Sequence, residues 1–321
     1  MTEIPAIDGL RVGVLFGGAS PERPGSVASA EAAAKAMNSI GAVPELIDLA
    51  DAPWAELRER IDVALLASHG LGGEDGKVQG TLDTLRVRYT GSGVMASALG
   101  MHKPTFKRIL CSEMIDTPKW VALNPELSTA STVSTVKYSL GFPVFFKPVS
   151  GGGSLEAGIA WDETGFWQLL ERSKEHPYAA YMVEEYVPGR PCTVGVLEVE
   201  GELTVLPVHD VETDRPFYDY EAKHDLSLRR EHCPSILPEQ TTKLMQQLAL
   251  RVHRRIGAHG LSRVDFMATE SGRTTMLEIN TVPGLSEAGN LATMARAGGM
   301  EYPVLLEHVL KTAFTKPPYV P

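Results

Sequence analysis

The stretch SRVDFMATESGRTTMLEIN, residues 262–280, gives the clearest indication of the fold and of the chemistry. Its two halves, Ser262–Ala268 and Thr274–Asn280, have the length and composition of short strands and are joined around Ser271-Gly272. This arrangement predicts a β-hairpin.

Polar side chains of this hairpin form a candidate cation site. Glu278 and Asn280 are two residues apart on one strand and therefore point to the same face, and Asp265 lies on the partner strand. Two carboxylates and an amide oxygen suit Mg²⁺, which takes few protein ligands together with phosphate oxygens. Arg263 lies on the same face as Asp265, where it would meet a phosphate or a developing oxyanion. A solvated polar strand with a surface salt bridge would show the same spacing.

The first hundred residues predict a parallel α/β sheet, because strands and helices alternate along them. Ser26 is the expected N-cap of a helix that runs to Ile40, where Gly41 ends it. The expected strands are Arg11–Phe16, which ends in Gly17-Gly18, then Leu46–Leu49 and Val63–Ala67.

The rest of the chain mixes strand pairs with helices, which predicts antiparallel α+β structure. The clearest helix is amphipathic, because Leu244, Leu248, Val252 and Ile256 recur every four residues. We expect three units, at residues 1–100, 101–190 and 191–321. The elements expected in the second and third units are strands at Pro143–Pro148 and Tyr181–Val187, helices at Glu163–Glu175 and Thr241–Ile256, and a hairpin of Thr193–Glu198 with Glu202–Val208.

Composition narrows the class of protein. The net charge is −10, from 30 Lys and Arg against 40 Asp and Glu, which argues against a general nucleic-acid or anionic-membrane binder. The three cysteines, Cys111, Cys192 and Cys233, form neither a disulfide scaffold nor a CxxC zinc site. No apolar run approaches the length of a membrane span, and the N-terminus lacks the regions of a signal peptide. We therefore expect a cytoplasmic protein.

Lys147-Pro148 and the glycine-rich loop Ser150–Ser154 form a candidate phosphate site. Glycines let backbone N–H groups approach a phosphate closely, and the lysine adds a positive charge. The pattern is neither a Walker A motif nor a dinucleotide fingerprint, and a glycine-rich hairpin tip is the more common explanation for such a loop.

Polar residues also follow two of the N-terminal strands, at the sheet edge where ligands of open α/β sheets bind. Glu22, in the segment after the first strand, could hold a substrate ammonium, or it could be a carboxylate near a helix N-terminus. His69-Gly70 and Glu74-Asp75-Gly76 occupy the same edge after the third strand.

These pieces, in this order, resemble the D-alanine–D-alanine ligases of the ATP-grasp superfamily over roughly residues 10 to 312. The resemblance implies an ATP-grasp fold with an N-terminal parallel α/β domain, and ATP held between the second and third domains. In the family chemistry, ATP phosphorylates the carboxylate of one amino acid, and the amine of a second attacks the acyl phosphate. The matching motifs are LFGGASPE, HGLGGEDGKVQG, YTGSGVMASALGMHK, LGFPVFFKP, VEEYVPGR, FYDYEAK, RVDF and LEINTVPG.

The resemblance assigns roles to individual residues. It implies ATP with Mg²⁺ or Mn²⁺ as cofactors, amino-acid substrates and a homodimer. The ATP-binding positions are Lys103, Lys147, Gly152, Ser154, Glu184 and Lys223, and the metal ligands are Asp265, Glu278 and Asn280. Arg263, the Gly284 backbone, Glu22 and His224 fall on catalytic positions, and Glu22, Gly25, His69, Gly153, Tyr220, Gly289 and Asn290 on substrate positions.

The departures from the family pattern lie mostly in the amino-acid pocket. Gly25 replaces a valine, Gly153 a serine and His224 a tyrosine, and Gly289-Asn290 replaces the Ser-Leu pair that holds the second carboxylate. Outside that pocket, Pro191 replaces the glutamate that binds ribose, and His102 replaces the aspartate before Lys103.

Three functions are consistent with this pattern. The preferred one is an ATP-dependent carboxylate–amine ligase that acts on something other than two D-alanines, such as a D-cycloserine-type cyclisation or an unusual dipeptide. The second is an ordinary D-alanine–D-alanine ligase of peptidoglycan synthesis. The third is a nucleotide-binding pseudoenzyme, against which the complete Asp265/Glu278/Asn280 set and both lysines argue.

Overall fold

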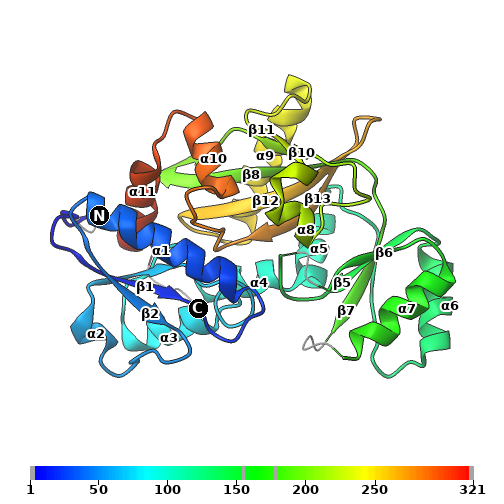
Figure 1. The fold of residues 1–321 in the computed structure, drawn as a ribbon, viewed down its shortest axis with the longest axis horizontal. Coiled ribbons are helices and arrows are strands. Elements are labelled where there is room, and N and C mark those ends of the chain that lie inside the picture. The colour runs from blue at the N-terminus through cyan, green and yellow to red at the C-terminus, as the bar shows by residue number, and fades with distance from the viewer. Residues whose placement is uncertain (1–3, 154–155, 176–179, 318–321) are drawn as a thin grey trace.

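The computed structural model describes residues 4–153, 156–175 and 180–317. Three β-sheets organise them, and Figure 1 shows one sheet at the lower left, one at the lower right and the largest above. Among these residues, no helix has both the length and the apolar character that crossing a membrane requires.

The N-terminal sheet is parallel, as predicted. Its strands are β1 (Arg11–Phe16), β2 (Val43–Asp48) and β3 (Val63–Leu66), in the order β2-β1-β3. Val12 and Val14 of β1 are fully buried, so the apolar run forms the core of this sheet. The accompanying helices are α1 (Arg23–Ser39), α2 (Leu57–Arg60), α3 (Lys77–Leu85), α4 (Val94–Met101), which runs across residue 100, and α5 (Lys103–Ser112).

The prediction that Ser26 caps α1 was wrong. The helix begins at Arg23, before Ser26, with a proline in its first turn, where a missing N–H costs nothing. The Ser26 hydroxyl instead accepts the N–H of Gly17 at 2.8 Å and donates to the carbonyl of Ala67 at 2.7 Å. Ser26 thus joins the ends of β1 and β3, and α1 ends before Gly41, as expected.

The second sheet is antiparallel, in the order β4-β7-β5-β6. Figure 1 shows α6 and α7 on its outer side. The aromatic rings of Phe146 and Phe166 are buried between sheet and helices. The elements are β4 (Trp120–Ala122), α6 (Thr129–Ser139), β5 (Val144–Pro148), β6 (Gly158–Ala160), α7 (Glu163–Ser173) and β7 (Tyr181–Glu185).

The third sheet has six strands in the order β11-β10-β8-β12-β13, with β9 paired to β8. The predicted hairpin is confirmed as β12 and β13, which pair antiparallel. The strands are β8 (Arg190–Val199), β9 (Glu202–Val205), β10 (His209–Glu212), β11 (Arg230–His232), β12 (Leu261–Ala268) and β13 (Thr274–Asn280). The helices are α8 (Tyr220–His224), α9 (Glu239–Arg255), α10 (Asn290–Ala297) and α11 (Tyr302–Thr315), and a 3₁₀ turn spans Leu226–Leu228.

Helix α9 packs on this sheet with a face that differs from the predicted one. Val252 and Ile256 are buried as expected, but Leu244 is 44% exposed. Met245 and Ala249 take its place in the core, because the buried stripe of a helix follows a period of 3.6 residues rather than four.

Candidate active site

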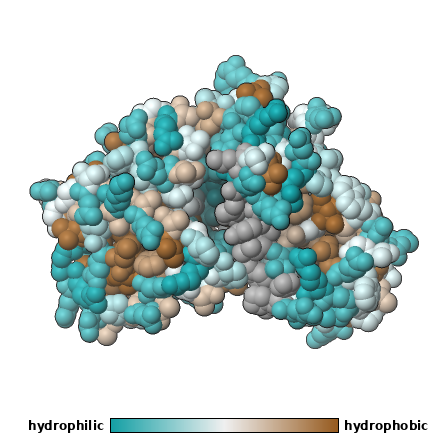
Figure 2. Space-filling model, in the orientation of Figure 1, coloured by the Kyte–Doolittle hydropathy of each residue, from teal (hydrophilic) through white to brown (hydrophobic). Residues whose placement is uncertain are grey.

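A cavity of about 610 Å³ is lined by residues from the units of all three sheets. Glu22 and His69 line it from the N-terminal unit, Lys147 from the second sheet, and Arg263 and Asp265 from the third. Figure 2 shows the molecular surface hollowed near its centre, between the two lower lobes.

The carboxylates of the hairpin form a row across the third sheet. Asp265 pairs with Glu278 on one side and with Thr193 of β8 on the other, so the three side chains share a face. Arg263 donates to both oxygens of Asp265, at 2.9 and 2.8 Å. The carboxamide oxygen of Asn280 accepts the N–H of Val282 at 2.9 Å. Asp265 and Asn280 are therefore held in place by the protein itself.

Positive charge surrounds Glu278. Burial by itself would raise the pKa of this carboxyl, but Lys103, Lys147, Lys223 and Arg263 outweigh it and lower the pKa to about 2. Lys103 Nζ lies 3.5 Å from Glu278 Oε2. Glu278 is therefore ionised at neutral pH and faces several cations.

This donor set fits a magnesium ion that shares its coordination with phosphates. No cluster of three or more His, Cys, Asp or Glu side chains in the described part of the chain could hold a metal alone. Asp265, Glu278 and Asn280 supply hard oxygen atoms from adjacent strands, and Mg²⁺ takes its remaining ligands from water and substrate phosphates.

A buried cluster of two lysines and one glutamate lies behind the second sheet's part of the cleft. Lys107 and Lys147 each place Nζ 2.9 Å from Glu184 Oε1. Lys107 also donates to the hydroxyl of Thr117 at 2.6 Å. Lys147 and Glu184 were predicted for this site, whereas Lys107 was not; it lies one helical turn after Lys103 on the buried face of α5.

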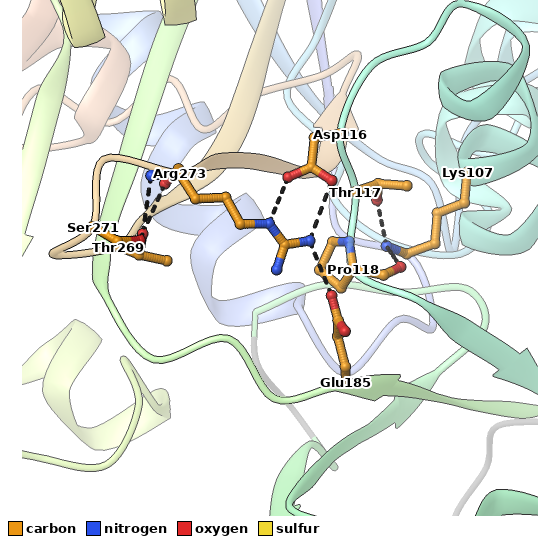
Figure 3. A network of polar contacts seen from close by, with 8 residues as sticks. All are labelled: Lys107, Asp116, Thr117, Pro118, Glu185, Thr269, Ser271 and Arg273. Atoms are coloured by element: carbon orange, nitrogen blue, oxygen red, sulfur yellow. Dashed lines mark hydrogen bonds and ion pairs between the residues drawn. The ribbon is translucent and has the colours of Figure 1, made fainter. Parts of the chain in front are cut away.

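A second ionic network connects the β12–β13 hairpin to the end of β7, which borders the cleft (Figure 3). Arg273 donates to Asp116 at 2.7 and 3.2 Å and to Glu185 at 3.0 Å. Glu185 ends β7 and lines the cavity next to Glu184. Arg273 therefore links the second and third sheets at the edge of the cleft.

Glu22 faces the cleft rather than capping α1. Its side chain makes no capping hydrogen bond, and Oε1 accepts the N–H of Gly152 at 2.9 Å. Glu74 also lines the cavity and is buried, although the sequence identifies it only as part of a motif. Burial raises the pKa of both carboxyls, and the nearby charge of Glu22 raises that of Glu74 further. The pair thus favours a proton or a substrate cation between them.

His69 is held as a neutral imidazole. Its Nε2 lies 3.0 Å from Ser29 Oγ and its Nδ1 lies 3.2 Å from the carbonyl oxygen of Val282. Burial, assisted by the charge of Arg263, lowers the pKa of His69 to about 4 against the opposing effect of Val282.

The positions that depart from the family pattern also border the cavity. Its lining includes the departing positions Gly25, Gly153, Pro191, Gly289 and Asn290. A Cβ at Gly25 would meet no atom within 4 Å, whereas one at Gly289 would lie 2.9 Å from Ser286 Oγ. His102 has a local role, because its Nδ1 accepts the N–H of Thr105 at 3.3 Å and caps α5.

Some predicted site residues have limited description. Ser154 lies outside the described residues, and so do the side chains of Tyr220 and His224, whose backbones belong to α8. Lys223, in the same helix, lines the cavity, and burial lowers its pKa.

Two antiparallel sheets border one cleft, with lysines on one side and an oxygen-rich strand pair on the other. This arrangement defines an ATP-grasp fold. The family profile described as "D-ala D-ala ligase C-terminus" matches residues 109–311. The D-alanine–D-alanine ligase of Geobacter sulfurreducens is 35% identical over 312 residues, which cover 95% of each chain. That of Alkalilimnicola ehrlichii is 38% identical over 301 residues, 94% of this chain and 93% of the relative.

A solved structure agrees with these relatives. The D-alanine–D-alanine ligase of Bacillus anthracis complexed with ATP superposes with a TM-score of 0.79 at 28% identity, covering 95% of this chain and 97% of that one. The chain belongs to the D-alanine–D-alanine ligase family. It is an ATP-grasp ligase that forms a C–N bond and produces ADP.

Proposed function

We propose that this enzyme joins two D-amino acids, and that its first subsite takes a side chain larger than the methyl group of D-alanine. The observation that carries the proposal is the meeting of Lys103, Lys147, Asp265, Glu278 and Glu22 around one cleft. Cationic and anionic groups there can hold a metal-bound triphosphate next to an amino-acid ammonium.

The nucleotide would lie between the second and third sheets. Lys103 and Lys147 would bind its phosphates, beside the glycine-rich loop at Gly151–Gly153. Glu184 lies next to the end of β7 and the segment 186–187, which line the cavity and would border the base. Mg²⁺, held by Asp265, Glu278 and Asn280, would neutralise charge on the transferring phosphate.

The first amino acid would lie on the N-terminal side of the cleft. Glu22, with Glu74 beside it, binds the ammonium, and neutral His69 orients the substrate. The substrate carboxylate attacks the γ-phosphorus and ADP leaves. The second amine then attacks the acyl carbon, and phosphate leaves with the former carboxylate oxygen. Arg263 and the N–H of Gly284 stabilise the oxyanion of the tetrahedral intermediate.

Two glycines support the substrate proposal. The open space at Gly25 provides room beside Glu22 that a valine would fill. At the second subsite, Ser286 Oγ occupies the position next to Gly289, so a hydroxyl remains available for a carboxylate. This arrangement favours a dipeptide product over an intramolecular cyclisation.

Ordinary D-alanine–D-alanine ligation is the second candidate. The names and high coverage of the relatives favour it. In either case we propose that residues 1–100, 101–190 and 191–321 act as three domains and that the enzyme works as a homodimer, as the family resemblance implies.

The test is phosphate release from ATP with Mg²⁺ and single or paired D-amino acids, with the product identified by mass spectrometry. Turnover that is faster with a longer D-amino acid than with D-alanine supports the proposed first subsite. A preference for D-alanine on both sides supports the second candidate and refutes the larger subsite. Binding of ATP without turnover on any pair would refute both.

A further inference from the structure

Helix α8 carries Lys223 into the cleft, and side chains outside the helix hold its backbone. The residue before Lys223 is fixed at both of its polar groups. The N–H of Ala222 donates to Asp219 Oδ1 at 2.8 Å, and its carbonyl oxygen accepts from Arg229 Nη1 at 2.8 Å. Ala222 is fully buried, so neither contact exchanges readily with water.

Arg229 is itself held by the edge of the third sheet. Its Nε donates to Glu231 Oε1 at 2.5 Å, and Glu231 Oε2 lies 3.6 Å from His209 Nε2. The His209 side chain is 1% exposed and that of Arg229 12%. The contact with His209 lowers the pKa of Glu231 most, and the contact with Arg229 lowers it further. Together they outweigh burial, which raises it, and the pKa falls to about 2. Glu231 is therefore a carboxylate that holds two partners at once.

These contacts begin on two strands of the third sheet, β10 and β11. His209 begins β10, and Glu231, in the adjacent strand β11, pairs with Val211 of β10. His209 also pairs with Thr193, which lies next to Asp265 in the same row of the sheet. The contacts therefore connect the sheet that carries the carboxylates to the helix that carries Lys223.

We propose that Arg229 and Glu231 are positioning residues, which set the place of Lys223 in the cleft through the carbonyl of Ala222. The ammonium of Lys223 lies in the field of Glu278, Asp265 and Glu22, and its charge acts on the nucleotide and substrate bound there. This inference rests on the proposed function, because it assigns Lys223 a part in that reaction. Small misplacements of a group at a reacting centre have large effects on rate.

The test is the variant Arg229→Met, compared with a matched control. We expect kcat to fall at least about tenfold, because Lys223 loses its fixed backbone. The control is Arg11→Met. Arg11 makes the same pair of contacts away from the cleft, to Asp62 at 2.7 Å and to the carbonyl oxygen of Glu59 at 2.6 Å. We expect its kcat to equal that of the parent enzyme.

A double-variant cycle separates positioning from general structure. Lys223→Met alone should lower kcat, and adding Arg229→Met to it should change kcat by less than about twofold, since the positioned group is already absent. If the two effects multiply, or if Arg229→Met retains parent kcat, the inference is wrong. Glu231→Gln provides the same cycle should Arg229→Met fail to fold, with a smaller expected loss.

Hydrogen exchange provides a readout that does not depend on activity. Backbone amides of residues 220–224 should exchange faster in Arg229→Met and unchanged in Arg11→Met. An enzyme with no ligase turnover would refute the proposed function, and the exchange result would still decide whether Arg229 holds α8. Unchanged exchange in Arg229→Met would overturn the inference.

Discussion

Glu184→Gln should destabilise the protein strongly, because Glu184 is the counter-charge for a fully buried lysine. The side chains of Lys107 and Glu184 are 0% and 3% exposed, and the carboxylate also binds Lys147 at 2.9 Å. The amide of glutamine keeps the shape and loses the charge, so both ammonium groups stay in place without a compensating anion.

The expected loss follows from this burial. Removing one partner of a buried ion pair costs about 3–5 kcal/mol of folding free energy. Lys107 can limit the loss by releasing its proton, because burial already lowers its pKa. We therefore expect a decrease near the lower end, about 3 kcal/mol.

Urea unfolding followed by circular dichroism measures this decrease. The matched control is Glu163→Gln, which removes an exposed partner of Lys137 and should cost less than about 1 kcal/mol. Adding Lys107→Met to Glu184→Gln should recover at least about 1 kcal/mol, since the fully buried ammonium of Lys107 is then removed and only Lys147 is left without the carboxylate. A Glu184→Gln protein as stable as the control would refute this reasoning.

Four further predictions concern the cleft. Glu278→Ala should lower kcat at least about a hundredfold while leaving the fold intact, and parent-like ligation would contradict the metal assignment. Gly25→Val, measured by kcat/KM for D-alanine against a longer D-amino acid, should shift preference towards D-alanine without loss of stability; an unchanged preference would refute the open subsite. KM for ATP and for 2′-deoxy-ATP should differ less than about thirtyfold, because Pro191 offers the ribose no side-chain acceptor and one lost hydrogen bond is worth about 0.5–1.5 kcal/mol. Stability should fall by up to about 3 kcal/mol between pH 6.5 and 4, because unfolded chains bind a proton on His69 that the folded protein excludes; His69→Gln should lose this part of the slope in urea titrations.

Sequence patterns predicted the elements whose signals are local. The apolar run Arg11–Phe16 is β1 to the residue, and the hairpin with Asp265 and Glu278 on its two strands follows from strand spacing. The direct pairing of Asp265 with Glu278 depends on a β-bulge between Asp265 and Phe266, which the spacing does not predict. The N-terminus of α1 was harder to predict. Serine is a common N-cap residue, but the hydroxyl of Ser26 joins the ends of β1 and β3 instead.

Contacts between distant segments could not be predicted from one sequence. Lys107 and Glu184 are 77 positions apart in the numbering (184 − 107), and only the packing of α5 on the second sheet brings them together. The chain Arg229–Glu231–His209 depends likewise on how β11 pairs with β10. Sequence motifs located the cleft, whereas the partners that hold its residues in place required the fold.

The transfer of carboxylate oxygen to phosphate tests the central claim most directly. The enzyme would be given ATP, Mg²⁺ and D-amino acids whose carboxylates carry heavy oxygen, and the released phosphate would be analysed by mass spectrometry. If the carboxylate attacks the γ-phosphorus and the amine then displaces phosphate, each phosphate formed contains one heavy oxygen atom and ADP is the nucleotide product. Phosphate without the label, or AMP as the product, would contradict ligation through an acyl phosphate.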